Sequence, residues 1–177
     1  MADEYNVAVW DACVLISAID QASPRWPAIE PWLRDAERGE FQIVVPETVV
    51  AELRYLPVAT EEGVPQERQD DLISKFLLNP YIVRRSVHRG ISELAATIGR
   101  KHKSVKRVGD AIVLATALFW QVPVVHTYDG DGKKNGLLNL DCVLGDKTKL
   151  RIMTPDYGAN TLFGTPNNEE AKKKKRA

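Results

Sequence analysis

Short apolar runs rich in β-branched residues alternate with helical patterns along most of the chain. The runs with the length of buried strands are Val7 to Trp10, Phe41 to Val45, Tyr81 to Val83, Val124 to His126 and Leu150 to Met153. Such alternation predicts an α/β fold of three layers, in which helices cover both faces of a central parallel sheet. In folds of this class, ligands bind at the carboxyl ends of the strands.

Proline and glycine residues set the expected limits of the helices. Helices are predicted after Asp11, over 31–38, from Pro46 to Leu56, over Gln66 to Leu78, from Ile91 into the basic segment, and from Gly109 and Asp110 to Trp120. The stretch from Ser23 to Pro31 contains three prolines, so it is predicted to be a connection. Pro46 is expected in a first helical turn, which tolerates proline.

The length of 177 residues indicates one principal domain, expected over 1–155, with a C-terminal extension over 156–177. That extension has a basic end, Lys172 to Arg176. Lys plus Arg equals Asp plus Glu, so the overall charge neither favours nor excludes a nucleic-acid partner. We expect a cytoplasmic protein, because no signal peptide or membrane span is seen and the two cysteines lack a CxxC spacing.

Acidic residues follow two of the predicted strands. Asp11 comes directly after Val7 to Trp10, and Asp129 follows Val124 to His126 after Thr127. Because the carboxyl ends of parallel strands share one edge, Asp11 and Asp129 are expected there together. Taken alone, Asp11 could equally be a turn residue or helix N-cap.

Two further acids lie on predicted helices. Asp110 opens the most apolar helix of the sequence, where it could serve as a simple N-cap or place a carboxylate at the rim of the core. Glu52 could be an exposed side chain paired with Arg54, and Glu47, in a first helical turn, is a nearby alternative.

Gathered carboxylates need a counter-charge. Two of them 4 Å apart repel by about 4 kcal/mol at an effective dielectric near 20. A hard cation such as Mg²⁺ or Mn²⁺ would neutralise them and support phosphodiester cleavage through an activated water. The segment from Asp129 fails as an EF-hand loop, since Lys134 replaces the required glycine and Leu140 the bidentate glutamate.

In their order along the chain, these segments resemble the PIN-domain nucleases, and most closely the VapC-like toxins of bacteria and archaea. The matching segments are Val7 to Ile19, Ile43 to Leu56, Gly109 to Leu118 and Val124 to Asp131. The resemblance implies an α/β/α fold and a Mg²⁺- or Mn²⁺-dependent endoribonuclease. It further implies an RNA substrate such as tRNA or mRNA, an antitoxin partner and a homodimer.

Carried over by position, the resemblance assigns roles to individual residues. The catalytic acids would be Asp11, Glu52, Asp110 and Asp129, and the metal ligands Asp11, Asp110, Asp129 and an outer Asp131. Thr127 would support the site. A basic run before Asp110, consisting of Arg100, Lys101, Lys103, Lys106 and Arg107, is expected to contact the RNA backbone, and Lys133 and Lys134 are further candidates.

Two departures from the family pattern keep alternatives open. Cys13 stands where the family often has Ser, Thr or Asn, and a thiol is a poorer hydrogen-bond partner. The chain also carries extra residues at 57–70 and 130–149. A catalytically degenerate PIN-like module that binds RNA or protein is therefore the alternative. A phosphoacceptor domain of the receiver type fits poorly, because Asp110 and Glu52 lie on predicted helices.

Overall fold

A computed structural model describes residues 5–53, 66–132, 135–140 and 150–156 of the chain. The strands in these ranges are β1 (Val7–Trp10), β2 (Gln42–Pro46), β3 (Ile82–Arg85), β4 (Val124–His126) and β5 (Arg151–Met153). The helices are α1 (Ala12–Ile19), α2 (Trp26–Glu37), α3 (Glu47–Glu52), α4 (Gln66–Leu77), α5 (Arg89–Lys101) and α6 (Val108–Phe119), with a 3₁₀ turn η1 (Leu137–Leu140).

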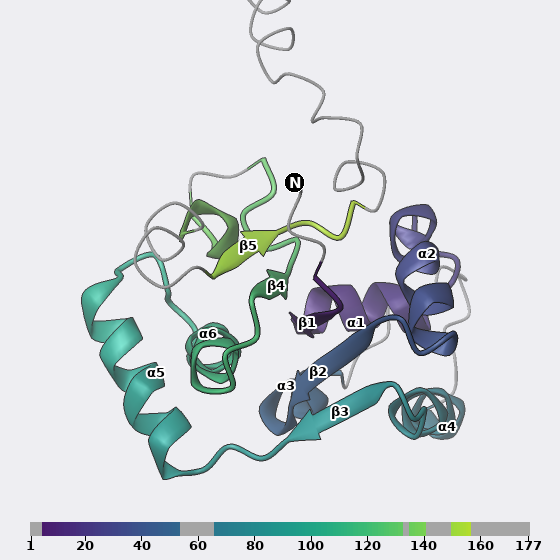
Figure 1. Ribbon diagram of the computed structural model, residues 1–177, viewed down its shortest axis with the longest axis horizontal. Coiled ribbons are helices and arrows are strands. Elements are labelled where there is room, and N and C mark those ends of the chain that lie inside the picture. Colours follow the sequence, from purple (N-terminus) through teal and green to yellow (C-terminus); the bar gives the residue numbers. More distant parts are fainter. Residues whose placement is uncertain (1–4, 54–65, 133–134, 141–149, 157–177) are drawn as a thin grey trace, which may run out of the picture.

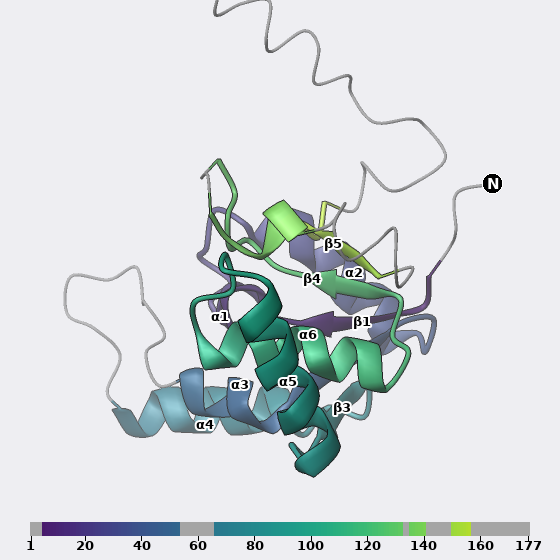
Figure 2. The same cartoon turned by 90° about the vertical axis from the view of Figure 1, so that its left-hand side faces the viewer.

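The strands form one sheet in the order β3-β2-β1-β4-β5, and every neighbouring pair is parallel. Helices α5 and α6 lie on one side of this sheet and α1, α2 and α4 on the other (Figure 1). Turned by 90°, the molecule shows α5 and α6 in front of the strands (Figure 2). The predicted three-layer α/β fold with a central parallel sheet is thus confirmed.

The strand order reverses direction at β1. From β1 the chain adds β2 and β3 on one side, and then returns to place β4 and β5 on the other. The carboxyl ends of β1 and β4 therefore lie at a topological switch point, where open α/β sheets leave a crevice for ligands. A receiver-type domain has the order 2-1-3-4-5 instead, so the sheet excludes that alternative.

Helix α2 begins earlier than its prolines suggest. It starts at Trp26, so the prediction of a connection up to Pro31 was wrong. Pro27 lies in the first turn, where a backbone N–H has no helical acceptor, and Pro31 removes one further hydrogen bond. Buried residues at helical spacing hold the helix, and Trp32 donates from its indole to the Pro155 carbonyl at 3.1 Å.

Two helix starts differ by a few residues from the prediction. Pro46 is the last residue of β2 and the N-cap of α3, where it was expected inside the first turn. Helix α6 begins at Val108 after the N-cap Arg107, so Asp110 lies within its first turn and is not the N-cap. The predicted end of the helix after Pro46, at Leu56, lies outside the described residues.

An aromatic cluster surrounds the end of β4. His126 is fully buried, with the rings of Tyr5, Trp10, Trp32 and Phe41 around it. Its Nε2 is hydrogen-bonded to the Tyr5 hydroxyl at 2.9 Å, while its Nδ1 has no partner among the described residues. Burial lowers the pKa of His126 to about 3, so the ring is neutral at physiological pH.

No helix in the described ranges is long and apolar enough to cross a membrane.

Acidification is expected to destabilise the fold through His126. Its pKa in the folded protein lies below the ordinary value of 6.5, so its contribution is complete above pH 6.5 and is lost as the pH falls towards 3. The loss is at most about 1.4 kcal/mol per pH unit. Urea unfolding at about pH 7.5 and about pH 5 should show a flatter pH dependence for His126→Asn than for the wild type. Equal slopes would contradict this origin of acid sensitivity.

Candidate active site

Asp11 is the residue at which β1 ends and α1 begins. Its backbone N–H donates to the His126 carbonyl at 3.1 Å, which extends the pairing of β1 with β4 by one residue. Its Oδ1 accepts from the N–H of Ala12 at 2.7 Å and caps α1. The residue is 6% exposed. Asp11 is thus a helix cap and also a buried carboxylate at the switch point.

Thr127 joins the acids that follow β1 and β4. This residue is fully buried, and its Oγ1 donates to Asp11 Oδ2 at 2.7 Å. The same oxygen accepts from the backbone N–H of Asp129 at 2.9 Å. One hydroxyl therefore fixes the carboxylate of Asp11 and the backbone of Asp129 together. The supporting role expected for Thr127 remains a prediction.

The thiol of Cys13 is a second donor to Asp11. Its Sγ lies 3.2 Å from Asp11 Oδ2, 3.5 Å from the Thr127 hydroxyl and 3.2 Å from the backbone N–H of Tyr128, which donates to it. Burial and then the charge of Asp11 raise the pKa of Cys13 to about 12. The thiol is therefore protonated at neutral pH and can donate. Although a thiol is a poorer hydrogen-bond partner than the Ser, Thr or Asn common at this position in the family, Cys13 contacts both Asp11 and Thr127.

The chain returns to Asp129 after a short loop. The N–H of Leu137 donates to Asp129 Oδ2 at 3.1 Å, and the N–H of Leu138 to the Asp129 carbonyl at the same distance. Gly130 and Gly136 make this return possible, since a Cβ on Gly136 would lie 2.4 Å from the Gly130 Cα. Both have positive φ, +94° and +140°. Neither hydrogen bond was predicted, although the two glycines could have indicated that the backbone comes close to itself here.

Asp110 is where the charges of the other acids converge. Burial, and then the charges of Asp11 and Asp129, raise the pKa of Asp110 to about 6. Glu52 adds to this effect and Arg107 opposes it. Side chains from α3, α6 and the ends of β1 and β4 therefore lie within electrostatic reach of one another. The structure brings together the four acids predicted from the sequence.

Glu52 is the last residue of α3, and its carboxylate lies against Gly109. A Cβ at Gly109 would come 2.0 Å from Glu52 Oε1, so a side chain there would displace the carboxylate. Partial desolvation and then the charge of Asp11 raise the pKa of Glu52, and Arg107 lowers it. Because the side chain is exposed, solvent screens these effects, and they are weaker than at Asp110. Arg54, its alternative partner, lies outside the described residues.

Asp131 stands apart from the other acids. It is exposed, and its charge acts on the pKa of Tyr128. It is absent from the neighbours that raise the pKa of Asp110. The structure does not bring Asp131 into the group of acids. If Asp131 binds a metal ion, it would therefore do so through water.

The acid group fits a hydrated cation better than a fully protein-bound one. In the ranges that the structure covers, no three His, Cys, Asp or Glu side chains are close enough to hold one ion together. Mg²⁺ usually keeps several waters and takes only one or two carboxylates directly. The raised pKa of Asp110 also reflects repulsion that a cation would relieve.

The predicted basic residues are spread over the end of α5 and the segment before α6. Arg107 reaches the acids, since it lowers the pKa of both Glu52 and Asp110. The other members are Arg100 and Lys101 in α5 and Lys103 and Lys106 in the connection. Each of these is exposed. Lys133, Lys134 and the basic end Lys172 to Arg176 lie outside the described residues.

A groove of about 570 Å³ opens beside the acids between α3 and α6. It is lined by Thr48, Ala51, Glu52, Arg107, Val108, Gly109 and Ile112. The sequence offered no signal for it, because Val108 lies before the predicted start of the helix and Ile112 has the pattern of any apolar position within it.

The chain is thus an α/β protein with a parallel sheet and acidic residues at its switch point. A sequence profile of the PIN domain matches residues 8–136, and the chain belongs to this family. That match confirms the resemblance inferred from the motifs, and the family supports a nuclease role.

The solved structures similar to this chain include two of VapC toxins. The structure of VapC20 from Mycobacterium tuberculosis, described as a Sarcin-Ricin loop cleaving toxin, has a TM-score of 0.56 at 13% identity, covering 71% of this chain and 91% of that chain. The structure of VapBC2 from Rickettsia felis, bound to a DNA fragment from their promoter, has a TM-score of 0.55 at 11% identity, covering 82% and 96%. At these identities the likeness shows the fold. No match was found among curated protein sequences.

Removing the charge of Asp110 should stabilise the protein. Its folded pKa of about 6 lies above its ordinary 3.8, so ionised Asp110 is destabilising at neutral pH. Asp110→Asn should gain about 1 kcal/mol in urea unfolding with EDTA at about pH 7.5, after allowance for solvent screening. The gain should shrink as the pH falls from about 6 to about 4. Asp131→Asn is the control, with no gain expected; a loss of stability in Asp110→Asn would contradict the argument.

Thr127→Val should cost about 1–3 kcal/mol of stability, because the Asp129 N–H loses its acceptor and the buried Asp11 carboxylate keeps only the hydrogen bonds from Ala12 and Cys13. Thr127→Ser keeps the hydroxyl and should retain most of that free energy. Chemical denaturation of the three proteins provides the comparison. If the Val and Ser variants were equally stable, the hydroxyl would not hold the two segments together.

Proposed function

We propose that the protein is a Mg²⁺- or Mn²⁺-dependent endoribonuclease that hydrolyses RNA phosphodiester bonds. The observation that carries the proposal is the convergence of charge at Asp110. Burial raises the pKa of this group most, the carboxylates of Asp11, Asp129 and Glu52 raise it further, and among the described residues Arg107 opposes them. Carboxylates that repel one another destabilise the folded state, so a positively charged ligand is the simplest reason for bringing them together.

A hard divalent cation suits these carboxylate oxygens. One or two of Asp11, Asp110 and Asp129 would bind it directly and the rest through water, and Asp131 would also reach it only through water. Bound there, the ion would supply a nucleophilic water and neutralise charge on the phosphate. Because Thr127 and Cys13 donate to Asp11 Oδ2, that carboxylate is oriented before any ligand arrives.

Glu52 and Arg107 suit the remaining tasks of phosphodiester hydrolysis. The Glu52 carboxylate is reached by solvent and has a raised pKa, which suits it to accept a proton from the attacking water. The exposed guanidinium of Arg107 can pair with a phosphate oxygen beside the acids. Arg100, Lys101, Lys103 and Lys106 would attract the RNA backbone at longer range.

The biological role that we infer is the toxin of a type II toxin–antitoxin pair. The similar folds of VapC20, described as a toxin, and of VapBC2 support this role. Its substrate would be a tRNA or mRNA in the cytoplasm. An antitoxin protein would be its partner, and the toxin would form a homodimer.

One observation favours a degenerate PIN-like module that binds RNA or protein without cleaving. In the part of the chain that the structure describes, the acids do not form a set of three direct metal ligands. Calorimetric titration with Mn²⁺ separates the two functions. An isotherm that is lost in Asp110→Asn supports the nuclease, whereas RNA binding without any metal isotherm supports the binding module.

Cleavage of RNA should require the cation and the acids. The full chain should cut a folded RNA with Mg²⁺ or Mn²⁺ and stop cutting in EDTA. Asp11→Asn and Asp129→Asn should each lower the rate at least about 100-fold, because they remove oxygens that face the ion. Asp71→Asn is the matched control, since this exposed acid on α4 pairs with Lys75. Unchanged cleavage in EDTA, or in Asp11→Asn, would refute the proposal.

A further inference from the structure

We propose that the groove between α3 and α6 binds one base of the RNA beside the scissile phosphate, and that it prefers a base with an exocyclic amino group. The inference rests on the proposed ribonuclease function and names a contact that would decide where the enzyme cuts. It is carried by the groove's position, its apolar wall and the Glu52 carboxylate that lines it.

The groove is continuous with the candidate active site. Glu52 belongs to both, since its carboxylate acts on Asp110 and lines the groove. Arg107 lines it as well and lowers the pKa of Asp110. A group held there is therefore next to the acids, with a guanidinium available for its phosphate.

The walls suit a flat group with a polar edge. Val108 is 75% exposed, an unusual position for an apolar residue in the first turn of a helix. With Ala51 and Ile112 it presents methyl groups to the groove. Removing such apolar surface from water is favourable, and a stacked base would do so.

A base edge in the groove would meet the Glu52 carboxylate. RNA-binding proteins read unstacked bases through hydrogen bonds to such edges. The Thr48 hydroxyl is buried within the groove wall and is not among the groups that a base would meet.

The acceptors along the groove determine the expected preference. The ionised Glu52 carboxylate at the groove only accepts hydrogen bonds. Amino groups of cytosine, adenine and guanine donate, and carboxylates accept from such groups in nucleic-acid complexes. Uracil presents two carbonyl oxygens that would face the carboxylate, so it should bind less well.

Methyl NMR of the full chain tests base binding without metal or phosphate. Adding cytidine or adenosine in EDTA should give saturable shifts at the methyl groups of Thr48, Ala51, Val108 and Ile112. Uridine should shift them less, and ribose not at all. Val108→Asn replaces the methyl groups by an amide of similar size and should weaken the shifts, while Leu78→Asn, the matched control at an exposed apolar residue outside the groove, should retain them. Absent shifts, equal shifts with ribose, or no difference between cytidine and uridine would overturn the proposal.

RNA cleavage separates this inference from the proposed function. Val108→Asn should raise KM about threefold to tenfold, because the base loses apolar contact, while kcat changes little. It should also alter which positions are cut, whereas Leu78→Asn should cut as the wild type does. If the wild type cuts and Val108→Asn keeps the same KM and cutting pattern, the base site is refuted. If the wild type fails to cut while the nucleoside shifts persist, the nuclease function fails instead.

Discussion

Repulsion between carboxylates at the carboxyl edge of β1 and β4 is the constraint around which this site is built. The fold opposes it with hydrogen bonds from groups that have little freedom to move. Asp11 receives the N–H of Ala12, the hydroxyl of Thr127 and the thiol of Cys13. Each bond to a charged acceptor is stronger than one between neutral groups. Among the described acids, Asp110 is the one whose pKa is raised furthest.

The donors to Asp11 come from elements that the sheet already fixes. Asp11 and Thr127 directly follow adjacent parallel strands, whose pairing continues to the N–H of Asp11. The aromatic cluster around His126 lies at the ends of the same two strands, where His126 and Trp10 are fully buried. The site is therefore preorganised by the core, which is the condition under which a few polar groups orient a ligand well.

Much of this arrangement could be predicted from the sequence because it depends on local signals. The runs Val7 to Trp10 and Val124 to His126 are short, apolar and β-branched, and each leads directly to an acid or to Thr127. Glu52 was harder to choose, with Glu47 nearby. The structure separates them, since Glu47 pairs with Arg84 at 2.7 Å while Glu52 acts on Asp110.

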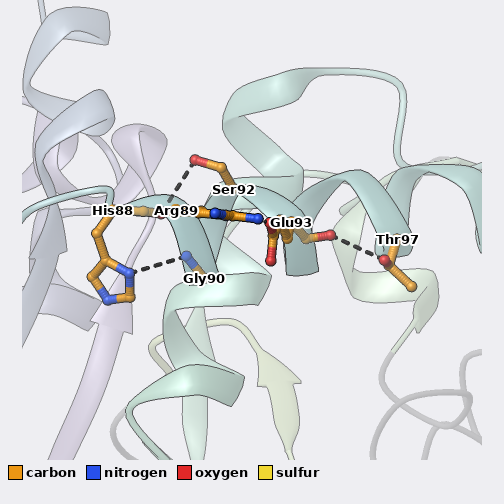
Figure 3. A network of polar contacts seen from close by, with 6 residues as sticks. All are labelled: His88, Arg89, Gly90, Ser92, Glu93 and Thr97. Atoms are coloured by element: carbon orange, nitrogen blue, oxygen red, sulfur yellow. Dashed lines mark hydrogen bonds and ion pairs between the residues drawn. The ribbon is translucent and has the colours of Figure 1, made fainter.

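The features that escaped prediction depend on contacts between distant segments. Helix α2 tolerates Pro31 because buried side chains such as Ile29 and Leu33 hold it, which no local rule can show. The groove exists only because α3 packs against α6. One local feature also escaped prediction. At the start of α5, His88 caps the helix by accepting from the Gly90 N–H (Figure 3). Ser92 donates to the His88 carbonyl, and Thr97 donates to the Glu93 carbonyl. Capping by histidine has no strong sequence signature.

The close approach of Gly130 and Gly136 has a practical consequence for protein engineering. The two backbones meet directly after Asp129, and the N–H of Leu137 then returns to its carboxylate. The ends of the intervening segment are thus fixed at the point where they meet, whatever residues lie between them. A peptide epitope or a fluorescent label inserted between these glycines would sit beside the active site without altering the path of the backbone that carries Asp129.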